Sequence, residues 1–195
     1  QVKGIGEKAA DAIQHWSKHF DIDAEYRRLR ESGARFVDWT SPEYPARLRE
    51  LYDPAIGFYA KGDVAMPEDQ PALAIVGTRQ TTLYGLRIAR QFAQRLANMG
   101  FTIVSGLARG IDTAAHEGAI EAGGRTIAVL GNGLDIIYPP ENLELYRSIS
   151  ESGAVMSEFP FGRRADRQTF PMRNRLVSGL SDGVLVVESD EGGAA

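Results

Sequence analysis

The sequence predicts an α/β fold: a doubly wound, mainly parallel sheet preceded by a small helical module. Two observations carry this prediction. From Pro71 onward, short runs of valine, isoleucine, leucine and alanine alternate with amphipathic segments of helical period, which is the pattern of strands covered by helices on both faces. The chain has 195 residues, of which 43% are hydrophobic, so it is long enough to enclose a substantial core.

The second part of the chain is expected to hold the sheet. Its apolar runs predict strands at residues 72–76, 101–105, 125–130, 154–158 and 183–189. Amphipathic spacing predicts helices between them at residues 84–99, 111–122, 141–150 and 174–180. Ligands of such sheets gather at the carboxyl ends of the strands. The loops expected to bind are therefore those after Val76, Val104, Leu130, Glu158 and Val187.

Residues 1–66 have a helical and irregular pattern. Helices are expected in residues 3–16 after a glycine turn, in residues 24–33 with Gly33 as terminator, and in residues 41–51 from about Pro45. The stretch KGDVAMPEDQP marks a boundary, so we expect an N-terminal module with its linker at 1–66 and a sheet domain at 67–195. No helix follows the last strand, which predicts that this domain is truncated and that sequence continues beyond Ala195.

Composition excludes several classes of protein. Without cysteine, the chain has no disulfide, no thiolate metal site and no cysteine nucleophile. It shows no signal peptide and no apolar run near 18 residues, so we expect a cytoplasmic protein without a membrane partner. His15 and His19 have the i, i+4 spacing of some metal sites, but no glutamate lies between them, and an ordinary amphipathic helix is the preferred interpretation. No metal and no cofactor are predicted.

The strongest local signal is the segment 159–175, FPFGRRADRQTFPMRNR. It holds five arginines and one aspartate, so it carries +4 in a chain of net charge −4, and the remaining residues sum to −8. Phe159, Phe161 and Phe170 lie among the arginines. Guanidinium groups beside aromatic rings suit a ligand with both phosphates and flat bases, such as single-stranded nucleic acid. A solvated basic loop with its aromatic rings in the core is the alternative.

Glycines follow the first three predicted strands. The first loop begins Gly77-Thr78-Arg79, the second Ser105-Gly106, and the third is GNG at 131–133. Glycine lets backbone N–H groups approach an oxyanion at the start of a helix, so these loops predict phosphate binding, with a tight strand-to-helix turn as the alternative. No GxxxxGK[ST] motif occurs, which argues against nucleoside triphosphate hydrolysis.

Taken in order, these segments resemble the DNA-processing protein A (DprA, also called Smf) family of bacterial transformation proteins. The matching motifs are IVGTR at 75–79, SGLARGIDTAAHEGAI at 105–120, AVLGNGLDIIYPPEN at 128–142, SEFP at 157–160, FPMRNR at 170–175 and SGLS at 178–181. The resemblance covers most of the chain. It implies a Rossmann-like sheet, and more loosely an N-terminal module that is SAM-like or helix-hairpin-helix-like. The turn KGIG at 3–6 is either part of such a module or a simple helix-capping turn.

The resemblance implies a binding protein rather than an enzyme. The family binds single-stranded DNA that enters the cell during natural transformation, protects it, helps load the RecA recombinase, and generally acts as a homodimer. By resemblance, Arg79 meets the DNA backbone, Arg167 lies at a basic position, and Phe170 faces the bases. The full set of expected nucleic-acid-binding residues is Gly77, Thr78, Arg79, Ser105, Gly106, Arg109, Arg163, Arg164, Arg167, Phe170, Arg173, Asn174 and Arg175.

A Rossmann-like phosphoribohydrolase, which would cleave nucleotides, is the alternative class. Its hallmark PGGxGTxxE segment does not occur here. Glu158 and Glu188 lie at strand ends, but no second acid at a recognisable spacing completes a pair for acid and base catalysis. Asp112 and His116 have an i, i+4 spacing; a proton-transfer couple is one interpretation, and a helix cap with a packed histidine is the favoured one. No catalytic residue is predicted.

Overall fold

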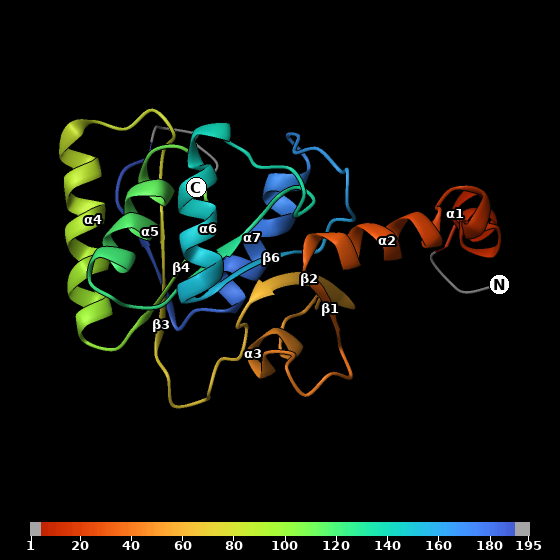
Figure 1. The fold of residues 1–195 in the computed structure, drawn as a ribbon, viewed down its shortest axis with the longest axis horizontal. Coiled ribbons are helices and arrows are strands. Elements are labelled where there is room, and N and C mark those ends of the chain that lie inside the picture. Colours follow the sequence, from red (N-terminus) through yellow and green to blue (C-terminus); the bar gives the residue numbers. More distant parts are fainter. Residues whose placement is uncertain (1–4, 190–195) are drawn as a thin grey trace.

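The computed structural model of the protein describes residues 5–189. Within that range one sheet has the strand order β1-β2-β6-β5-β4-β3-β7 (Figure 1). Its strands are β1 (Arg35–Asp38), β2 (Gly57–Gly62), β3 (Ala72–Val76), β4 (Thr102–Ser105), β5 (Thr126–Val129), β6 (Ala154–Ser157) and β7 (Gly183–Val186). Strands β3 to β7 are parallel, whereas β2 runs antiparallel to β6 and β1 antiparallel to β2. The prediction of a mainly parallel sheet is confirmed.

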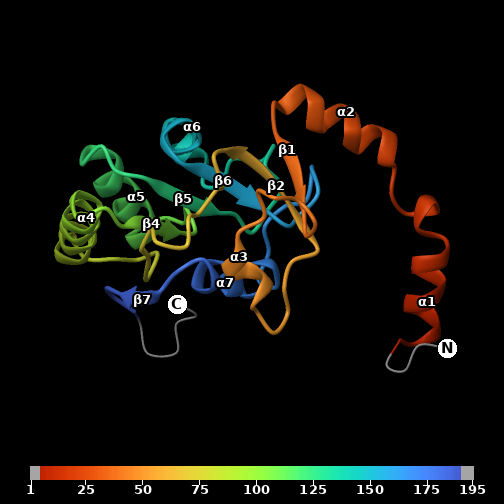
Figure 2. The ribbon, with the colours of Figure 1, turned by 90° about the horizontal axis from the view of Figure 1, so that it is seen from below.

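Helices cover both faces of this sheet (Figure 2). On one face lie α4 (Leu83–Asn98), α5 (Ile111–Glu121) and α6 (Leu143–Ser152), and on the other α3 (Ala46–Arg49) and α7 (Thr169–Gly179). Two 3-10 turns, η1 (Trp16–Lys18) and η2 (Pro140–Asn142), complete the connections. Among the described residues, no helix is both long and apolar enough to cross a membrane.

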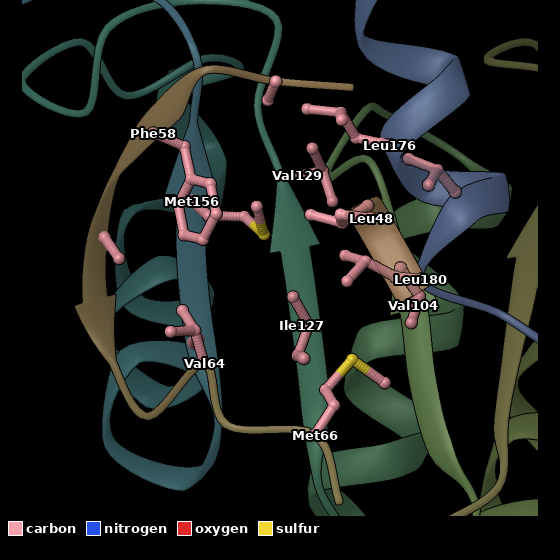
Figure 3. Close-up of a cluster of buried hydrophobic side chains, with 14 of the residues drawn as sticks. Leu48, Phe58, Val64, Met66, Val104, Ile127, Val129, Met156, Leu176 and Leu180 are labelled. Atoms are coloured by element: carbon pink, nitrogen blue, oxygen red, sulfur yellow. The ribbon is translucent and has the colours of Figure 1, made fainter. Parts of the chain in front are cut away.

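The core under α3 and α7 connects the N-terminal residues with the sheet. Leu48 of α3 and Leu176 of α7 pack with Val104, Ile127 and other buried side chains of this cluster (Figure 3). Burying side chains of this size contributes about 1.5 to 3 kcal/mol each, so this layer fixes α7 firmly on the strands. The position of α7 matters because its other face lines the groove described below.

All five strands predicted after residue 70 are present, and so are the four helices. One boundary is different: α7 begins at Thr169 rather than near residue 174. The carboxylate of Asp166 accepts hydrogen bonds from the N–H groups of Gln168 and Thr169, which starts the helix early. Pro171 is tolerated because the first turn needs no N–H donor from it.

The description of residues 1–66 as helical and irregular was wrong for β1 and β2. Phe58 and Ala60 of β2 are buried, and their neighbours in the strand are only half-buried. Short antiparallel strands of this kind carry few apolar residues, so their alternation was too weak to recognise. Since β2 pairs with β6, the sheet includes residues on both sides of the predicted boundary near residue 66. The division into two domains there stays a prediction.

The first two helices are α1 (Glu7–Gln14) and α2 (Ile22–Ser32). Gly33 ends α2 in the left-handed conformation at φ 68°, as its position in the sequence predicted. Asp21 caps the start of α2 by accepting a hydrogen bond from the N–H of Ala24. In both ribbon views α1 lies away from the sheet. Part of the KGIG turn, and the segment after Ser189, lie outside the described residues, and the likeness of this module to SAM or helix-hairpin-helix folds stays a prediction.

His116 of α5 is fully buried. Its Nδ1 atom donates to the hydroxyl of Thr126 at 2.7 Å, because that hydroxyl itself donates to the carbonyl of Ile103. Burial lowers the pKa of His116 from 6.5 to about 3. The packed-histidine interpretation is therefore correct, and His116 faces the core rather than a proton-transfer partner.

We expect acid to destabilise the protein through His116. Between the unfolded pKa of 6.5 and the folded pKa of about 3, the unfolded chain binds the proton and the folded protein does not. Stability should therefore fall by about 1.4 kcal/mol for each pH unit below roughly 6. Urea unfolding of the parent and of His116→Gln at several pH values measures the slope. An identical slope in both proteins would contradict this assignment, and His19→Gln serves as the exposed control.

Candidate nucleic-acid interface

A groove of about 840 Å³ lies at the carboxyl ends of β3 and β7. The chain passes from β3 through β4 and β5 to β6 on one side, and β7 then pairs with β3 on the other, so this is the topological switch point of the sheet. Ligands of doubly wound sheets bind at such points. The groove is lined by Val76, Gly77, Thr78, Arg79, Gln80, Ala108, Asp112, Arg167, Phe170, Pro171, Arg173, Asn174, Arg175, Val177, Ser178, Val184 and Ser189.

Arg79 and Phe170 form a stacked pair at this groove. The guanidinium carbon of Arg79 lies 4.1 Å from the centre of the Phe170 ring, which is cation–π geometry. Gly131 lies against the same ring, since a Cβ atom there would come within 3.1 Å of Cδ1 of Phe170. A loop after β3, a loop after β5 and the first turn of α7 thus meet around one aromatic side chain.

Apart from Arg173, which is buried, the arginines predicted to bind DNA fall into two groups. Arg163 pairs with Asp166 at 2.6 Å, Arg175 with Glu158 at 2.5 Å and Asp53 at 3.3 Å, and Arg109 with Glu141 at 2.5 Å. Arg79, Arg164 and Arg167 are exposed and make no ion pair within residues 5–189. The positive charge available at the groove therefore comes mainly from Arg79 and Arg167.

Arg173 is buried, with 5% of its surface exposed. Its Nη1 atom donates to the carbonyl of Val129 at 2.7 Å, and its guanidinium occupies the space that a side chain on residue 106 would need. Burial lowers the pKa of Arg173, and the negative charge of Asp112 partly opposes that shift. Arg173 therefore anchors α7 to the end of β5, and only part of it faces the groove.

The carboxylate of Asp112, in the first turn of α5, binds the backbone of the loop that precedes this helix. Its carboxylate accepts hydrogen bonds from the N–H groups of Gly106 at 3.1 Å and Ala108 at 3.4 Å. Burial raises the pKa of this carboxyl group, while Arg173 and the two amides oppose the shift. The helix-capping interpretation of Asp112 was wrong: α5 begins after Gly110 without a side-chain cap, and Asp112 binds the loop before the helix instead. The prediction that Gly106 offers its amide to a phosphate was wrong, because a side chain of the protein already takes it.

Ser105 is also unavailable to a ligand. It is fully buried, and its hydroxyl donates to the carbonyl of Ile75 at 2.6 Å. The predicted contact between this hydroxyl and a phosphate was therefore wrong. The sequence could not show this, since a serine at a strand end looks the same whether it faces a ligand or the neighbouring strand.

The loop after β3 is fixed by Glu188. The carboxylate of Glu188 accepts from the hydroxyl of Thr81 at 2.6 Å and from the N–H of Thr82 at 3.1 Å, and its carbonyl accepts from the N–H of Thr78 at 2.7 Å. Gly77 is needed for this close approach, because a Cβ atom would lie 2.6 Å from the Glu188 carbonyl oxygen. Glu188 therefore holds the loop that presents Arg79, and it occupies the start of α4 where a phosphate was expected.

Nine residues of the groove lining were not among the predicted site residues: Val76, Gln80, Ala108, Asp112, Pro171, Val177, Ser178, Val184 and Ser189. Phe170, Asn174 and Ser178 are spaced i, i+4, i+8 and so share one face of α7. If the helix had been predicted to begin at Thr169, the same spacing would have placed Ser178 on the face that carries Phe170 and Asn174.

No group of three or more histidine, aspartate or glutamate side chains in the described residues could hold a metal ion.

The fold and the groove define a Rossmann-like protein with a cationic, aromatic-lined groove at its switch point. The family described as DNA recombination-mediator protein A matches residues 35–195. The chain therefore belongs to that family, as its motifs predicted.

Curated relatives agree with this assignment. Protein Smf of Synechocystis is 41% identical over 192 residues, which cover 97% of this chain and 48% of the relative. DNA processing protein DprA of Bacillus subtilis is 41% identical over 162 residues, or 83% of this chain and 54% of the relative. The chain thus spans about half the length of these curated relatives.

Two solved structures share the fold. DprA from Streptococcus pneumoniae superposes with a TM-score of 0.76 at 36% identity, covering 86% of this chain and 58% of that one. DprA from Helicobacter pylori superposes with a TM-score of 0.72 at 32% identity, covering 80% of this chain and 70% of that one. The latter structure is described as giving insights into a unique single-stranded DNA binding mode of that protein.

Proposed function

We propose that this chain binds single-stranded DNA in the groove at the switch point. One observation carries the proposal: Arg79 and Arg167, which have no carboxylate partner among residues 5–189, share the groove with the Phe170 ring. Unpaired guanidinium groups suit phosphates, and an aromatic ring suits the face of a base. The relative from Helicobacter pylori, whose structure is described in terms of its single-stranded DNA binding, adds support.

The proposed contacts follow from the surroundings of each side chain. Arg79 and Arg167 contact phosphates, with Arg164 as a further exposed cation nearby in the chain. Phe170 stacks with a base, and Asn174 offers an amide to the strand from the same face of α7. Arg109, Arg163 and Arg175 meet DNA only by exchanging their present carboxylate partners.

A binding protein fits the site better than a nucleotide-cleaving enzyme. Glu158 is held in the ion pair with Arg175, Glu188 by the hydrogen bond from the N–H of Thr82, and Asp112 by the hydrogen bond from the N–H of Gly106. His116 lies in the core. These four candidates for acid and base chemistry thus all have structural roles, which supports the proposal that the chain is not an enzyme.

The wider role is proposed from the family. Family membership supports a protein that protects incoming single strands in the cytoplasm and helps load RecA recombinase during natural transformation. It also supports a homodimer. Two grooves on one strand would raise the apparent affinity through effective concentration, because a single groove with few unpaired arginines gives only modest binding.

The test is a titration of fluorescent oligo(dT), and of duplex of equal length, at several salt concentrations. Two or three phosphates held per protomer predict a slope of log affinity against log salt of about −1.4 to −2. Binding should be tighter to the single strand and tolerant of its sequence. A flat salt response, or tighter binding to duplex, would refute the proposal.

Arg167→Ala and Arg175→Ala form a matched pair in this experiment, since both arginines line the groove. Arg167→Ala should lower the salt slope by about 0.7, because an unpaired cation is lost from a phosphate. Arg175→Ala should change the slope less, because the charge of Arg175 is already balanced by Glu158. Equal changes in the two variants would show that the carboxylate pairing does not decide which arginines bind.

A further inference from the structure

A line of side chains continues from the groove toward α5. The Arg79 guanidinium stacks on Phe170, the Phe170 ring centre lies 6.2 Å from that of Tyr138, and the Arg109 guanidinium lies 5.9 Å from the Tyr138 ring. Two neighbouring aromatic rings thus lie between two cations, an arrangement that suits two bases with a phosphate on either side. Tyr138 is not part of the groove lining, and no DNA contact was predicted for it.

Tyr138 is a firmly placed and accessible ring, with 38% of its surface exposed. Before it, the side-chain amide of Asn132 donates to the carbonyl of Ile136 at 2.7 Å. After it, the side-chain amide of Asn142 donates to the hydroxyl of Thr113 at 2.8 Å. These bonds hold the loop at both ends, so the ring needs little ordering when a ligand binds.

Arg109 beside this ring can exchange its partner at low cost. The side chains of Arg109 and Glu141 are 51% and 54% exposed, so this ion pair is mostly in water. Such solvent-screened surface pairs contribute little to stability. A phosphate that reaches Tyr138 can therefore take the place of Glu141, gaining a charge-assisted hydrogen bond of the same kind.

We propose that Tyr138 is a second base-stacking platform for single-stranded DNA and that Arg109 holds the phosphate beside it. The strand then runs out of the groove, across Phe170 and onto Tyr138. This inference rests on the proposed function and extends it by a contact that lies outside the groove.

The experiment measures the affinity of oligo(dT) for Tyr138 variants. Tyr138→Ala and Tyr138→Leu should bind roughly 5- to 30-fold more weakly than the parent, because both remove the aromatic face. Tyr138→Phe should bind like the parent. An abasic oligonucleotide of equal length should bind the parent and Tyr138→Ala equally. Phe92→Ala is the control, since it removes a comparably exposed ring from the middle of α4.

A second arm tests Arg109. Glu141→Gln should strengthen binding and make the salt slope steeper by up to about 0.7. In this variant Arg109 does not have to break an ion pair with a carboxylate before it contacts a phosphate. Arg109→Ala should abolish that gain when combined with Glu141→Gln. Thermal melting of each free protein shows whether it is folded. If Tyr138→Ala is unstable, Tyr138→Leu still tests the aromatic contact, because leucine keeps the apolar volume of the side chain.

The outcomes separate this inference from the function on which it rests. A parent protein that binds no single strand would overturn both. A parent that binds, and loses affinity on Phe170→Ala, while Tyr138→Ala and Tyr138→Leu bind like the parent, would overturn the second platform alone. Weaker binding in both of these variants, with Tyr138→Phe and Phe92→Ala unchanged, supports it.

Discussion

Replacing Phe170 by alanine is expected to weaken the binding of single-stranded DNA by about 1 to 3 kcal/mol. The physical reason is the loss of one stacking face, which every base can use. The slope of log affinity against log salt should hardly change, because no cation is removed and no counterion release is lost. Fluorescence anisotropy with labelled oligo(dT) at several salt concentrations measures both quantities.

Arg79→Ala should behave differently from Phe170→Ala. It removes a cation from a phosphate, so it should weaken binding to every sequence and lower the salt slope by about 0.7. Because Arg79 also stacks on Phe170, the two substitutions should not be additive. A double-mutant cycle should give a coupling of about 0.5 to 1 kcal/mol, the range for an exposed cation–π pair.

Thermal melting of the free proteins is the control for this series. Both side chains are partly or fully exposed, so the variants should stay folded. If Phe170→Ala unfolds the protein while Arg79→Ala and Arg167→Ala bind like the parent, the segment 159–175 is structural and the DNA site lies elsewhere.

Asp112→Ala is expected to destabilise the protein by about 2 to 4 kcal/mol, because two buried N–H groups are left without an acceptor. Asp112 is only 5% exposed, and so is Arg173. Without the carboxylate, the N–H groups of Gly106 and Ala108 lose their hydrogen bonds, and the buried Arg173 loses the electrostatic attraction of Asp112. Urea unfolding measures the loss.

Two further variants make this stability prediction sharper. Asp112→Asn keeps an oxygen acceptor but removes the charge, so its cost should be smaller than that of Asp112→Ala. Glu144→Ala removes a carboxylate from the exposed pair with Arg147, and should cost no more than about 1 kcal/mol. An Asp112→Ala protein as stable as the Glu144→Ala control would contradict the structural role assigned to Asp112.

Much of the fold could be predicted from the order of residues. Continuous apolar runs such as ALAIV at 72–76 leave few alternatives to a buried strand, because both faces of the strand must avoid water. The family resemblance also placed Arg79, Arg167 and Phe170 in one group, and the structure brings all three to one groove. The strands β1 and β2 were missed because only alternate residues of β2 are buried and the strands are short.

The parallel sheet, the family and the loops that meet at the groove follow from the order of residues alone. Which of the chemically equivalent groups in those loops can still bind a ligand depends on contacts made in the folded protein. Arg167 and Arg175 look alike in the sequence, yet Glu158 lies beside one and not the other. Likewise, Asp112 takes the amide of Gly106, and the carbonyl of Ile75 takes the hydroxyl of Ser105. Charge pairing and hydrogen-bond satisfaction depend on distances of a few ångströms between residues far apart in the chain, and local sequence patterns do not contain those distances.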